Sequence, residues 1–175
     1  MGIAGTYTPE KLVMCVLSSS PDRVGDLRAL LVEQWGGIDF SSDPIPFIAT
    51  DYYAREMGAG IMRTFLSFQR LVDPSSLSQV KLRTNSLEGR FRVEGSRRVN
   101  LDPGLMALSR FSLATTKESA HRIPLSDGIF AEITLLYSKA GFRALEWTYP
   151  DFRTPAYLSA LNEIRALYKA QLRCA

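Results

Sequence analysis

The spacing of apolar residues along the chain predicts both strands and helices. Residues 12–17 are continuously apolar, a pattern typical of a strand that is buried on both faces. Residues 61–72 predict another strand, because the side chain of Phe65 points to the face opposite Leu66 and Phe68. Both segments are therefore expected to belong to the sheet of the protein.

Three segments repeat apolar residues every three or four positions, which is the spacing of an amphipathic helix. The first follows Ser20-Pro21 and ends at Gly36, the second begins at Asp73, and the third begins at Thr154. Each start has a capping side chain followed by a proline, a common beginning for a helix. The apolar stripes are Val24, Leu27, Leu31 and Trp35, then Leu77, Val80, Thr84, Leu87 and Phe91, and finally Tyr157, Leu161, Ile164, Tyr168 and Leu172.

Shorter apolar stretches predict the remaining strands. Ser126-Asp127-Gly128 is a turn signal that joins two of them into a hairpin, and Asp102-Pro103-Gly104 is interpreted as a turn that ends another. Two prolines near residue 45 exclude a regular central strand there, so that segment is expected at an edge. Residues 107–115 also fit a helical turn that leads into a strand. The expected short strands are residues 46–49, 99–101, 107–115, 123–125, 129–137 and 142–148.

The order of these elements is strand, helix, strands, helix, strands and helix. This order predicts an α+β fold in which a mostly antiparallel sheet carries about three helices, packed mainly on one face. A chain of 175 residues is long enough for one well-packed domain and short for two. We therefore expect a single domain over residues 1–175, with residues 1–10 as a loose N-terminal tail.

Composition and charge favour an ordinary globular protein. Apolar residues make up 46% and charged residues 22% of the chain, which is typical usage. The net charge of +3 does not favour a nucleic-acid partner, although the pI is about 9.0. One local basic cluster, at Arg90, Arg92, Arg97 and Arg98, is diluted by acidic neighbours and is expected to be a solvated helix end. RNA binding through this cluster is a third functional hypothesis, weaker than those of a small-ligand-binding domain and a protein-interaction module.

The chain shows no sign of export or membrane insertion. Its first residues lack a basic region followed by an apolar run, so they do not resemble a secretory signal. The longest apolar run, residues 12–17, is far shorter than a membrane span. Cys15 lies in that run and Cys174 is the second-last residue, which argues against a disulfide framework. These features predict a cytoplasmic protein with no membrane partner.

Five short motifs are distributed over nearly the whole chain. They are T-D-Y-Y-x-x-E-M-G at residues 50–58, R-V-N-L-D-P-G at 98–104, A-T-T-K at 114–117, H-R-I at 121–123 and W-T-Y-P-D-F at 147–152. Together they resemble an uncharacterised bacterial family known as domain of unknown function 4416. The resemblance implies a bacterial, single-domain, cytosolic protein, and it assigns no catalytic residue.

Some members of that family carry the label GTP-binding protein, but this sequence lacks the motifs of such a site. A phosphate-binding loop would read G-x-x-x-x-G-K-[ST] between a strand and a helix. The first strand is followed instead by S-S-S-P-D-R, and Gly58-Ala59-Gly60 is followed by Ile61 without a lysine. An N-K-x-D motif that reads guanine is also absent from the sequence. We therefore reject GTP binding as a mechanism for this chain.

Candidate catalytic residues surround the only histidine, His121. This side chain could act as a general base, with Asp102 and Glu132 supplying carboxylates that orient it. Each has a structural alternative: His121 at a hairpin end, Asp102 in a turn, and Glu132 in an ion pair with Arg63 or another cation. No cofactor is expected, because one histidine gives too few ligands for a transition metal. Asp102 or Glu132 still leaves an oxygen-rich Mg²⁺ site open.

Hydroxyl and cationic side chains nearby form a donor group that suits a phosphate or carboxylate ligand, with a solvated loop as the alternative. A second group, in which tyrosines follow the proline-rich segment, could line a pocket or lock its loop onto the sheet by ring burial. The candidate ligand-binding residues are Thr115, Thr116, Lys117, Arg122 and Asn100 in the first group, and Asp51, Tyr52 and Tyr53 in the second.

The favoured hypothesis is a small-ligand-binding domain, with or without enzymatic turnover, for an anionic or phosphorylated metabolite at a pocket around His121. The alternative is a non-catalytic protein-interaction module that uses the aromatic loop at residues 147–157. A cavity lined by His121, Asp102, Lys117 and Glu132 would favour the first hypothesis. A Glu132 that is simply paired with arginine in a filled core would count against it. The sequence predicts no particular oligomeric state.

Overall fold

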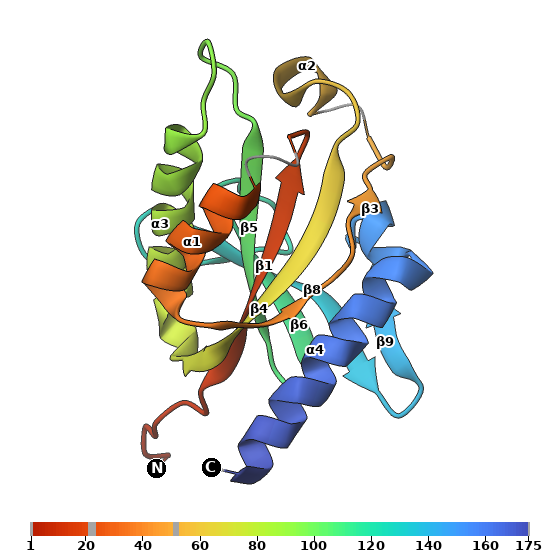
Figure 1. Cartoon of the computed structure of the whole chain (residues 1–175). Helices are drawn as coiled ribbons and strands as arrows, with labels where there is room; N and C mark the ends of the chain where they lie inside the picture. Colours follow the sequence, from red (N-terminus) through yellow and green to blue (C-terminus); the bar gives the residue numbers. More distant parts are fainter. Residues whose placement is uncertain (1, 21–23, 51–52, 175) are drawn as a thin grey trace.

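One antiparallel sheet runs through the whole molecule (Figure 1). The computed structural model describes residues 2–20, 24–50 and 53–174, and each neighbouring pair of strands within them is antiparallel. In sheet order the strands are β2 (Ile38–Ser41), β4 (Met62–Val72), β1 (Glu10–Ser18), β5 (Val99–Met106), β6 (Arg110–Thr115), β8 (Phe130–Ser138) and β7 (Ile123–Pro124). Two further strands lie off this path: β3 (Ile45–Pro46) pairs with β4, and β9 (Gly141–Ala144) pairs with β8.

Helical layers cover both faces of the sheet. In chain order the helices are α1 (Val24–Trp35), α2 (Ala54–Met57), η2 (Pro74–Ser76), α3 (Leu77–Arg90), η3 (Pro150–Arg153) and α4 (Pro155–Cys174). The longer helices α1 and α3 share one face, and α4 lies across the opposite face (Figure 1). The predicted α+β fold with a mostly antiparallel sheet and three main helices is confirmed. Among the described residues, no helix combines the length and apolar character that crossing a membrane requires.

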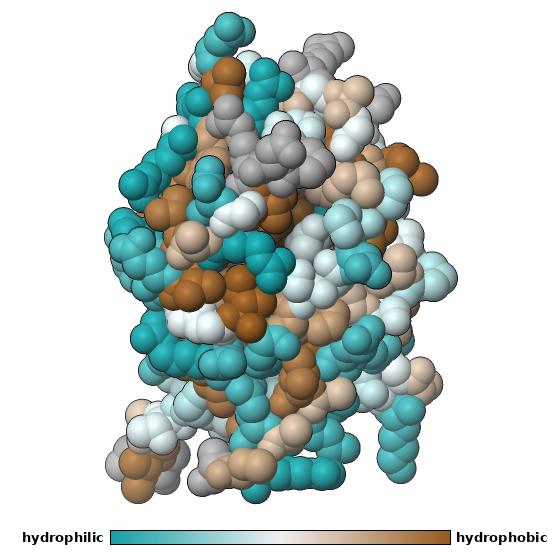
Figure 2. Space-filling view, viewed as in Figure 1, coloured by the Kyte–Doolittle hydropathy of each residue, from teal (hydrophilic) through white to brown (hydrophobic). Residues whose placement is uncertain are grey.

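The central strand β1 separates two halves of the hydrophobic core. Leu12, Met14 and Val16 pack with α1 and α3, whereas Val13 and Cys15 pack with α4. Burial of a leucine-sized side chain contributes about 2 kcal/mol, so the apolar run on β1 stabilises both layers at once. In the surface view of Figure 2, hydrophobic residues form small groups among hydrophilic ones, which agrees with a core enclosed between the layers.

Polar contacts tie the first strand to the last helix. The buried Lys11 on β1 donates from Nζ to the side chain of Gln171 on α4 at 2.7 Å. Tyr168 of α4 donates its hydroxyl hydrogen to the carbonyl of Pro9 at 2.8 Å. β1 begins already at Glu10, within the segment that the sequence suggested as a loose tail, and the Glu10 side chain is buried.

The predicted turn at Asp102-Pro103-Gly104 is wrong. β5 continues straight through these residues, and all three pair with β1 in an unbroken antiparallel register. The local signal misled because a proline can occupy a strand wherever its missing N–H is not needed. At Gly104 a side chain would meet the Ser112 carbonyl oxygen at 2.6 Å and the Phe111 ring at 2.8 Å. Glycine is therefore required there for the close approach of β6, not for a turn.

The sheet opens between β5 and β6. These strands pair at one end only, over the three residue pairs from Gly104 onward. Farther along β5 the backbone of Leu101 bonds to α3 instead: its N–H donates to Glu88 at 2.8 Å, and its carbonyl accepts from Lys81 at 2.9 Å. In an antiparallel strand, every second residue directs its backbone N–H and C=O to the same neighbouring strand. The backbone positions of Leu101, Pro103 and Leu105 therefore face the side of β5 where β6 lies. The missing N–H of Pro103 ends the pairing there.

Replacing Gly104 by alanine should destabilise the protein by about 2 kcal/mol, because the new methyl group would overpack the contact between β5 and β6. Urea denaturation of both proteins measures this difference in the free energy of unfolding. The matched control is Gly25→Ala on α1, where an added Cβ meets no atom within 4 Å. We expect the control to stay within about 1 kcal/mol of wild type. Equal effects of the two substitutions would contradict the close approach at Gly104.

Candidate functional site

A cavity of about 840 Å³ fills the gap between β5 and β6. α3 lines it from one face of the sheet, and the loop at Phe47 and the η3 residue Phe152 line it from the other. Since side chains from both layers meet here, the cavity extends through the plane of the sheet. The strand residues that line it are Arg63, Asn100, Asp102, Leu113, Ala114, Thr115 and Glu132.

One stripe of α3 faces this cavity. Lys81, Asn85 and Glu88 line it at spacings of four and three residues, which places them on the same side of the helix. Lys81 and Glu88 are buried although both are charged. These two residues were not among the site residues predicted from the sequence. A signal was present, because Lys81 and Glu88 stand at helical spacing directly beside the apolar stripe, where a charged side chain needs a partner.

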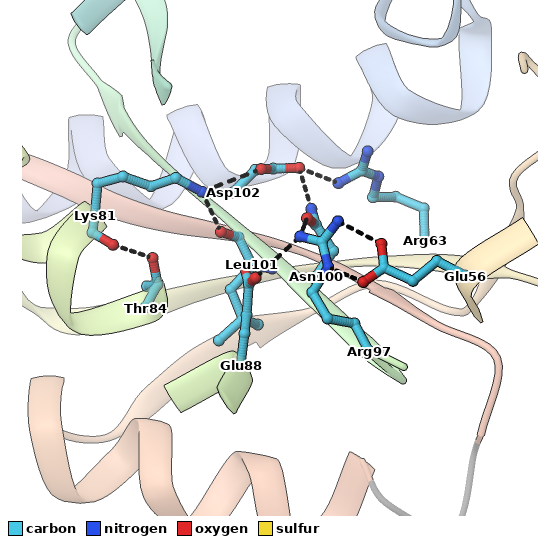
Figure 3. A network of polar contacts seen from close by, with 9 residues as sticks. All are labelled: Glu56, Arg63, Lys81, Thr84, Glu88, Arg97, Asn100, Leu101 and Asp102. Atoms are coloured by element: carbon cyan, nitrogen blue, oxygen red, sulfur yellow. Dashed lines mark hydrogen bonds and ion pairs between the residues drawn. The ribbon is translucent and has the colours of Figure 1, made fainter. Parts of the chain in front are cut away.

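Asp102 is the centre of a polar network that joins α3, β5 and β4 (Figure 3). Its carboxylate accepts a hydrogen bond from Asn100 Nδ2 at 2.7 Å. It also lies 3.4 Å from Lys81 Nζ on one side and 3.4 Å from Arg63 Nη1 on the other. The side-chain oxygen of Asn100, Oδ1, in turn accepts a hydrogen bond from Arg97 Nη1 at 3.3 Å. The network thus lines the β5 side of the gap with charged and polar side chains, where β5 has no backbone hydrogen bonds to β6.

Arg63 is a buried cation on β4, at one end of this network. Its Nη1 donates to the Cys15 carbonyl at 3.2 Å, and its Nη2 lies 3.6 Å from Asp151. The guanidinium carbon is 5.5 Å from the centre of the Phe47 ring, within the range of a cation–π contact. Burial lowers the pKa of Arg63, but the neighbouring acids raise that pKa by more, so the guanidinium stays charged.

Arg97 links α2 to α3 at the other end of the network. Its Nε and Nη2 donate to the two carboxylate oxygens of Glu56 at 2.8 and 2.7 Å. Its Nη1 lies 3.3 Å from Glu88. The hydrogen bonds from Arg97 lower the pKa of Glu56. The sequence suggested a solvated basic cluster here, but this arginine is paired with two acids that line the cavity.

Two carboxyl groups that line the cavity ionise less readily than usual. Burial raises the pKa of Glu88 above its ordinary value of 4.5, and the attraction of Lys81 and Arg97 offsets only part of that rise. Burial likewise raises the pKa of Asp151 above 3.8, against the attraction of Arg63. Carboxyl groups with raised pKa values exchange protons closer to neutral pH. Glu88 and Asp151 are therefore the candidates in this cavity for proton transfer to or from a ligand.

Most of the site residues predicted from the sequence line this cavity. Thr116 and Lys117 are exposed at its opening, whereas Asn100 and Glu132 are buried in its wall. Asp51 and Tyr52 lie outside the residues that the structure describes. The predicted residues that line the cavity are Asn100, Asp102, Thr115, Thr116, Lys117, Glu132 and Tyr53.

His121 lies behind the cavity wall, and the lining does not include it. Its ring stacks on Trp147, with ring centres 5.0 Å apart and an angle of 12° between the planes. Its Nε2 is 3.2 Å from Glu132, and its Nδ1 is 3.2 Å from the Ser119 hydroxyl. The cavity is thus built around Asp102, not around His121 as the sequence suggested, because packing on Trp147 holds the imidazole beside the wall.

Arg122 also lies outside the cavity lining, but it holds three lining residues together by hydrogen bonds, and we call it the clamp. Its three nitrogens donate to three separate segments at 2.8 Å each: Glu132 on β8, the carbonyl of Lys117, and the hydroxyl of Tyr149. All three of these partners line the cavity. Glu132 is therefore both a wall residue and half of a buried ion pair, which combines the two alternatives that the sequence left open.

Both acids suggested for Mg²⁺ have cationic neighbours. Asp102 lies between Lys81 and Arg63, and Glu132 is bonded to Arg122. In the described parts of the chain, no three His, Cys, Asp or Glu side chains come close enough together to hold a metal ion. A Mg²⁺ ion at either carboxylate stays a prediction.

The amino-acid sequence matches one known family. The pattern of a family described as a domain of unknown function (DUF4416) matches residues 8–168. This span contains every described residue that lines the cavity, from Phe47 to Phe152. No curated protein and no solved structure matches the chain. What the cavity does must therefore be inferred from its own geometry.

Removing the clamp should destabilise the protein strongly. Arg122→Ala leaves the buried carboxylate of Glu132 without its cation, and loss of one partner of a buried ion pair costs about 3–5 kcal/mol. Urea denaturation should show this loss. The double substitution Arg122→Met with Glu132→Gln removes both charges and should recover part of the stability. If Arg122→Ala were as stable as wild type, the clamp would contribute nothing to the wall.

Removing the ionisable group of Glu88 should change how stability depends on pH. A raised pKa means that the folded state binds the proton more tightly than the unfolded state. Protonated Glu88 therefore contributes to the free energy of unfolding. This contribution is complete below the unfolded-state pKa and is lost as the pH rises through the folded-state pKa. The stability of Glu88→Gln relative to wild type should therefore increase as the pH rises above about 4.5, the ordinary pKa of a glutamate. Glu163→Gln, at an exposed position of α4, is the control, and parallel pH profiles for wild type and Glu88→Gln would refute the assignment.

Proposed function

Since the chain belongs to the DUF4416 family, as its motifs predicted, and that description names no activity, we propose from its geometry that it binds a small anionic metabolite. The observation that carries the proposal is the open space between β5 and β6, where many charged side chains stand beside a few core residues in the lining. Its volume of about 840 Å³ is within the usual range for small-molecule sites.

A structural role alone does not account for this arrangement. Protein interiors are closely packed, and a void inside them costs stability. Burying charged groups is costly even when they are paired, and here Lys81, Glu88 and Arg63 are buried around the cavity. A fold that only needed to close the sheet could fill this gap with apolar side chains. The combination therefore supports a ligand that occupies the space and contacts the charges.

The distribution of charge supports an anionic ligand. Glu132 is matched by Arg122 behind the wall, so its charge is already balanced. The other charged side chains among the described lining residues are the cations Arg63, Lys81, Arg92, Arg97 and Lys117 and the acids Glu56, Glu88, Asp102 and Asp151. The cations exceed the acids by one. The exposed cations Arg92 and Lys117 mark the opening, where the hydroxyls of Thr115 and Thr116 add donors for a phosphate or carboxylate.

Any turnover would use groups that face the ligand. Glu88 and Asp151 line the cavity and have raised pKa values, so we assign proton transfer to them. The sequence suggested His121 as a general base. We assign it a positioning role instead, because it contacts Glu132 from outside the cavity lining. A cytoplasmic location is part of the proposal. The free thiols of Cys15 and Cys174 support it, because reducing compartments keep thiols unpaired.

A protein-interaction module at residues 147–157 has weaker support. Trp147 and Tyr149 are 39% and 43% exposed, but Phe152 and Tyr157 are each only 2% exposed and pack in the core with α4. Half of the aromatic side chains expected on that surface are therefore committed to folding. Exposed aromatic rings promote binding only where they are accessible to a partner, so the cavity is the better-supported site.

Filling the cavity should abolish ligand binding without unfolding the protein. Gly89 on α3 lines the cavity, and an added Cβ there meets no atom within 4 Å, so Gly89→Trp places a large ring in the space. Gly25→Trp on α1 is the matched control, since that position is equally open but does not line the cavity. The probes are a panel of nucleotides, phosphorylated metabolites and carboxylates, tested by thermal shift.

A true ligand at a hundred times its Kd should raise the melting temperature of wild type and of Gly25→Trp by about 5–10 °C. The same compound should leave Gly89→Trp unchanged. Small molecules released from the freshly purified protein and identified by mass spectrometry should include the same class of compound. If no compound of the panel binds and no small molecule is released from the purified protein, the proposal is wrong. A binder that is indifferent to Gly89→Trp would place the site elsewhere.

A further inference from the structure

We infer that the ligand is dipolar: opposite its anionic group it carries a protonated nitrogen, such as an ammonium, that binds the carboxylate of Asp102. This inference rests on the proposed function, because it concerns the same cavity. It goes further by assigning a chemical group to each end of the ligand. The distribution of charge along the cavity, the exposure of Asp102 and the unfilled acceptor capacity of its oxygens carry the inference.

The two ends of the cavity have opposite charge. The inner network contains one more acid than cations, whereas the opening has the exposed cations Arg92 and Lys117. A ligand with a cation inside and an anion outside matches both ends, and a simple anion matches only the opening. The charged members of the inner network are the cations Arg63, Lys81 and Arg97 and the acids Glu56, Glu88, Asp102 and Asp151.

Asp102 is the accessible group of this network that suits a cationic part of a ligand, since Arg97, which is 23% exposed, is itself a cation. The side chain of Asp102 is 26% exposed, whereas those of Arg63 and Lys81 are 4% and 7% exposed. The two cations therefore lie behind the carboxylate. Glu56 is also accessible, but both of its oxygens are bonded to Arg97. At its centre the cavity thus presents a hydrogen-bond acceptor with a negative charge.

The oxygens of Asp102 have capacity for further donors. A carboxylate accepts up to about four hydrogen bonds, and charge-assisted bonds to nitrogen are about 2.7–2.9 Å long. The Asn100 amide makes a bond of 2.7 Å, but the two cations lie at 3.4 Å, beyond that optimal distance. Asn100 cannot turn away, because its own oxygen accepts from Arg97. A third charged donor can therefore bind the carboxylate without breaking a short bond.

The backbone does not supply this donor. On the neighbouring positions of β5, Pro103 has no N–H, and the N–H of Leu101 is taken by Glu88. β6 has already separated from β5 at this point, so no strand lies opposite. In most sheets a strand at this position would have its partner strand alongside. Here the space next to Asp102 belongs to the cavity, and a donor on the ligand can reach it.

Three matched fragments test the inference on the wild-type protein. 4-(Aminomethyl)benzoate has an ammonium and a carboxylate at opposite ends of a ring, 4-methylbenzoate lacks the ammonium, and benzylamine lacks the carboxylate. Ligand-observed NMR titrations at millimolar concentration measure their affinities. We expect the dipolar compound to bind about tenfold more tightly than either of the others, the effect of one hydrogen bond to a charged group.

Asp102→Asn tests the role of the carboxylate, and Asp43→Asn at an exposed position away from the cavity is its control. The tenfold preference for 4-(aminomethyl)benzoate over 4-methylbenzoate should disappear in Asp102→Asn and persist in Asp43→Asn. Circular dichroism shows whether each variant is folded. If Asp102→Asn does not fold, the comparison of the three fragments on wild type still decides the question.

Three outcomes would overturn the inference: 4-methylbenzoate binding as tightly as the dipolar fragment, a preference that survives Asp102→Asn, or no binding by any of the three fragments. These outcomes are distinct from failure of the proposed function. If a compound from the metabolite panel still raises the melting temperature of wild type but not of Gly89→Trp, the cavity is a ligand site and only the dipolar assignment is wrong.

Discussion

The missing N–H of Pro103 is the constraint on which the layout of this protein depends. β5 keeps its full pairing with β1, but the position that faces β6 offers no donor, and the ladder ends there. Backbone groups left unpaired in the interior would be costly, and those of Leu101 are satisfied by Glu88 and Lys81 of α3. The gap in the sheet, the place of the helix beside it and the cavity all follow.

The side chains that bond the backbone of β5 where β6 is absent also line the candidate site. Lys81 bonds the carbonyl of Leu101 and lies beside Asp102, while Glu88 bonds the N–H of the same leucine and contacts Arg97. Lys81 and Glu88, which face a ligand, are therefore both anchored to the main chain of β5. Such an arrangement is already ordered before the ligand arrives, which lowers the entropic cost of binding. The stability of this region and its affinity for ligand depend on the same contacts.

Periodicity within single segments was enough to predict the three long helices, the central strand and the α+β class. It could not show that Pro103 lies inside a strand, because turn propensity competes there with pairing to β1, which lies far away in the sequence. Lys81 and Glu88 were passed over because their partner is the backbone of another element. His121 drew attention as the only histidine, but rarity in a sequence does not determine where a ring packs, and this one packs on Trp147.

The contacts between β1 and α4 determine when the protein can be completed during synthesis. Lys11 emerges from the ribosome well before its partner Gln171, which lies 160 residues farther along the chain. Until η3 and α4 emerge, the side of the sheet that carries Val13 and Cys15 lacks most of its apolar cover. The nascent chain therefore exposes this sheet face until α4 has been made, and chaperones that shield apolar surface can act during that interval.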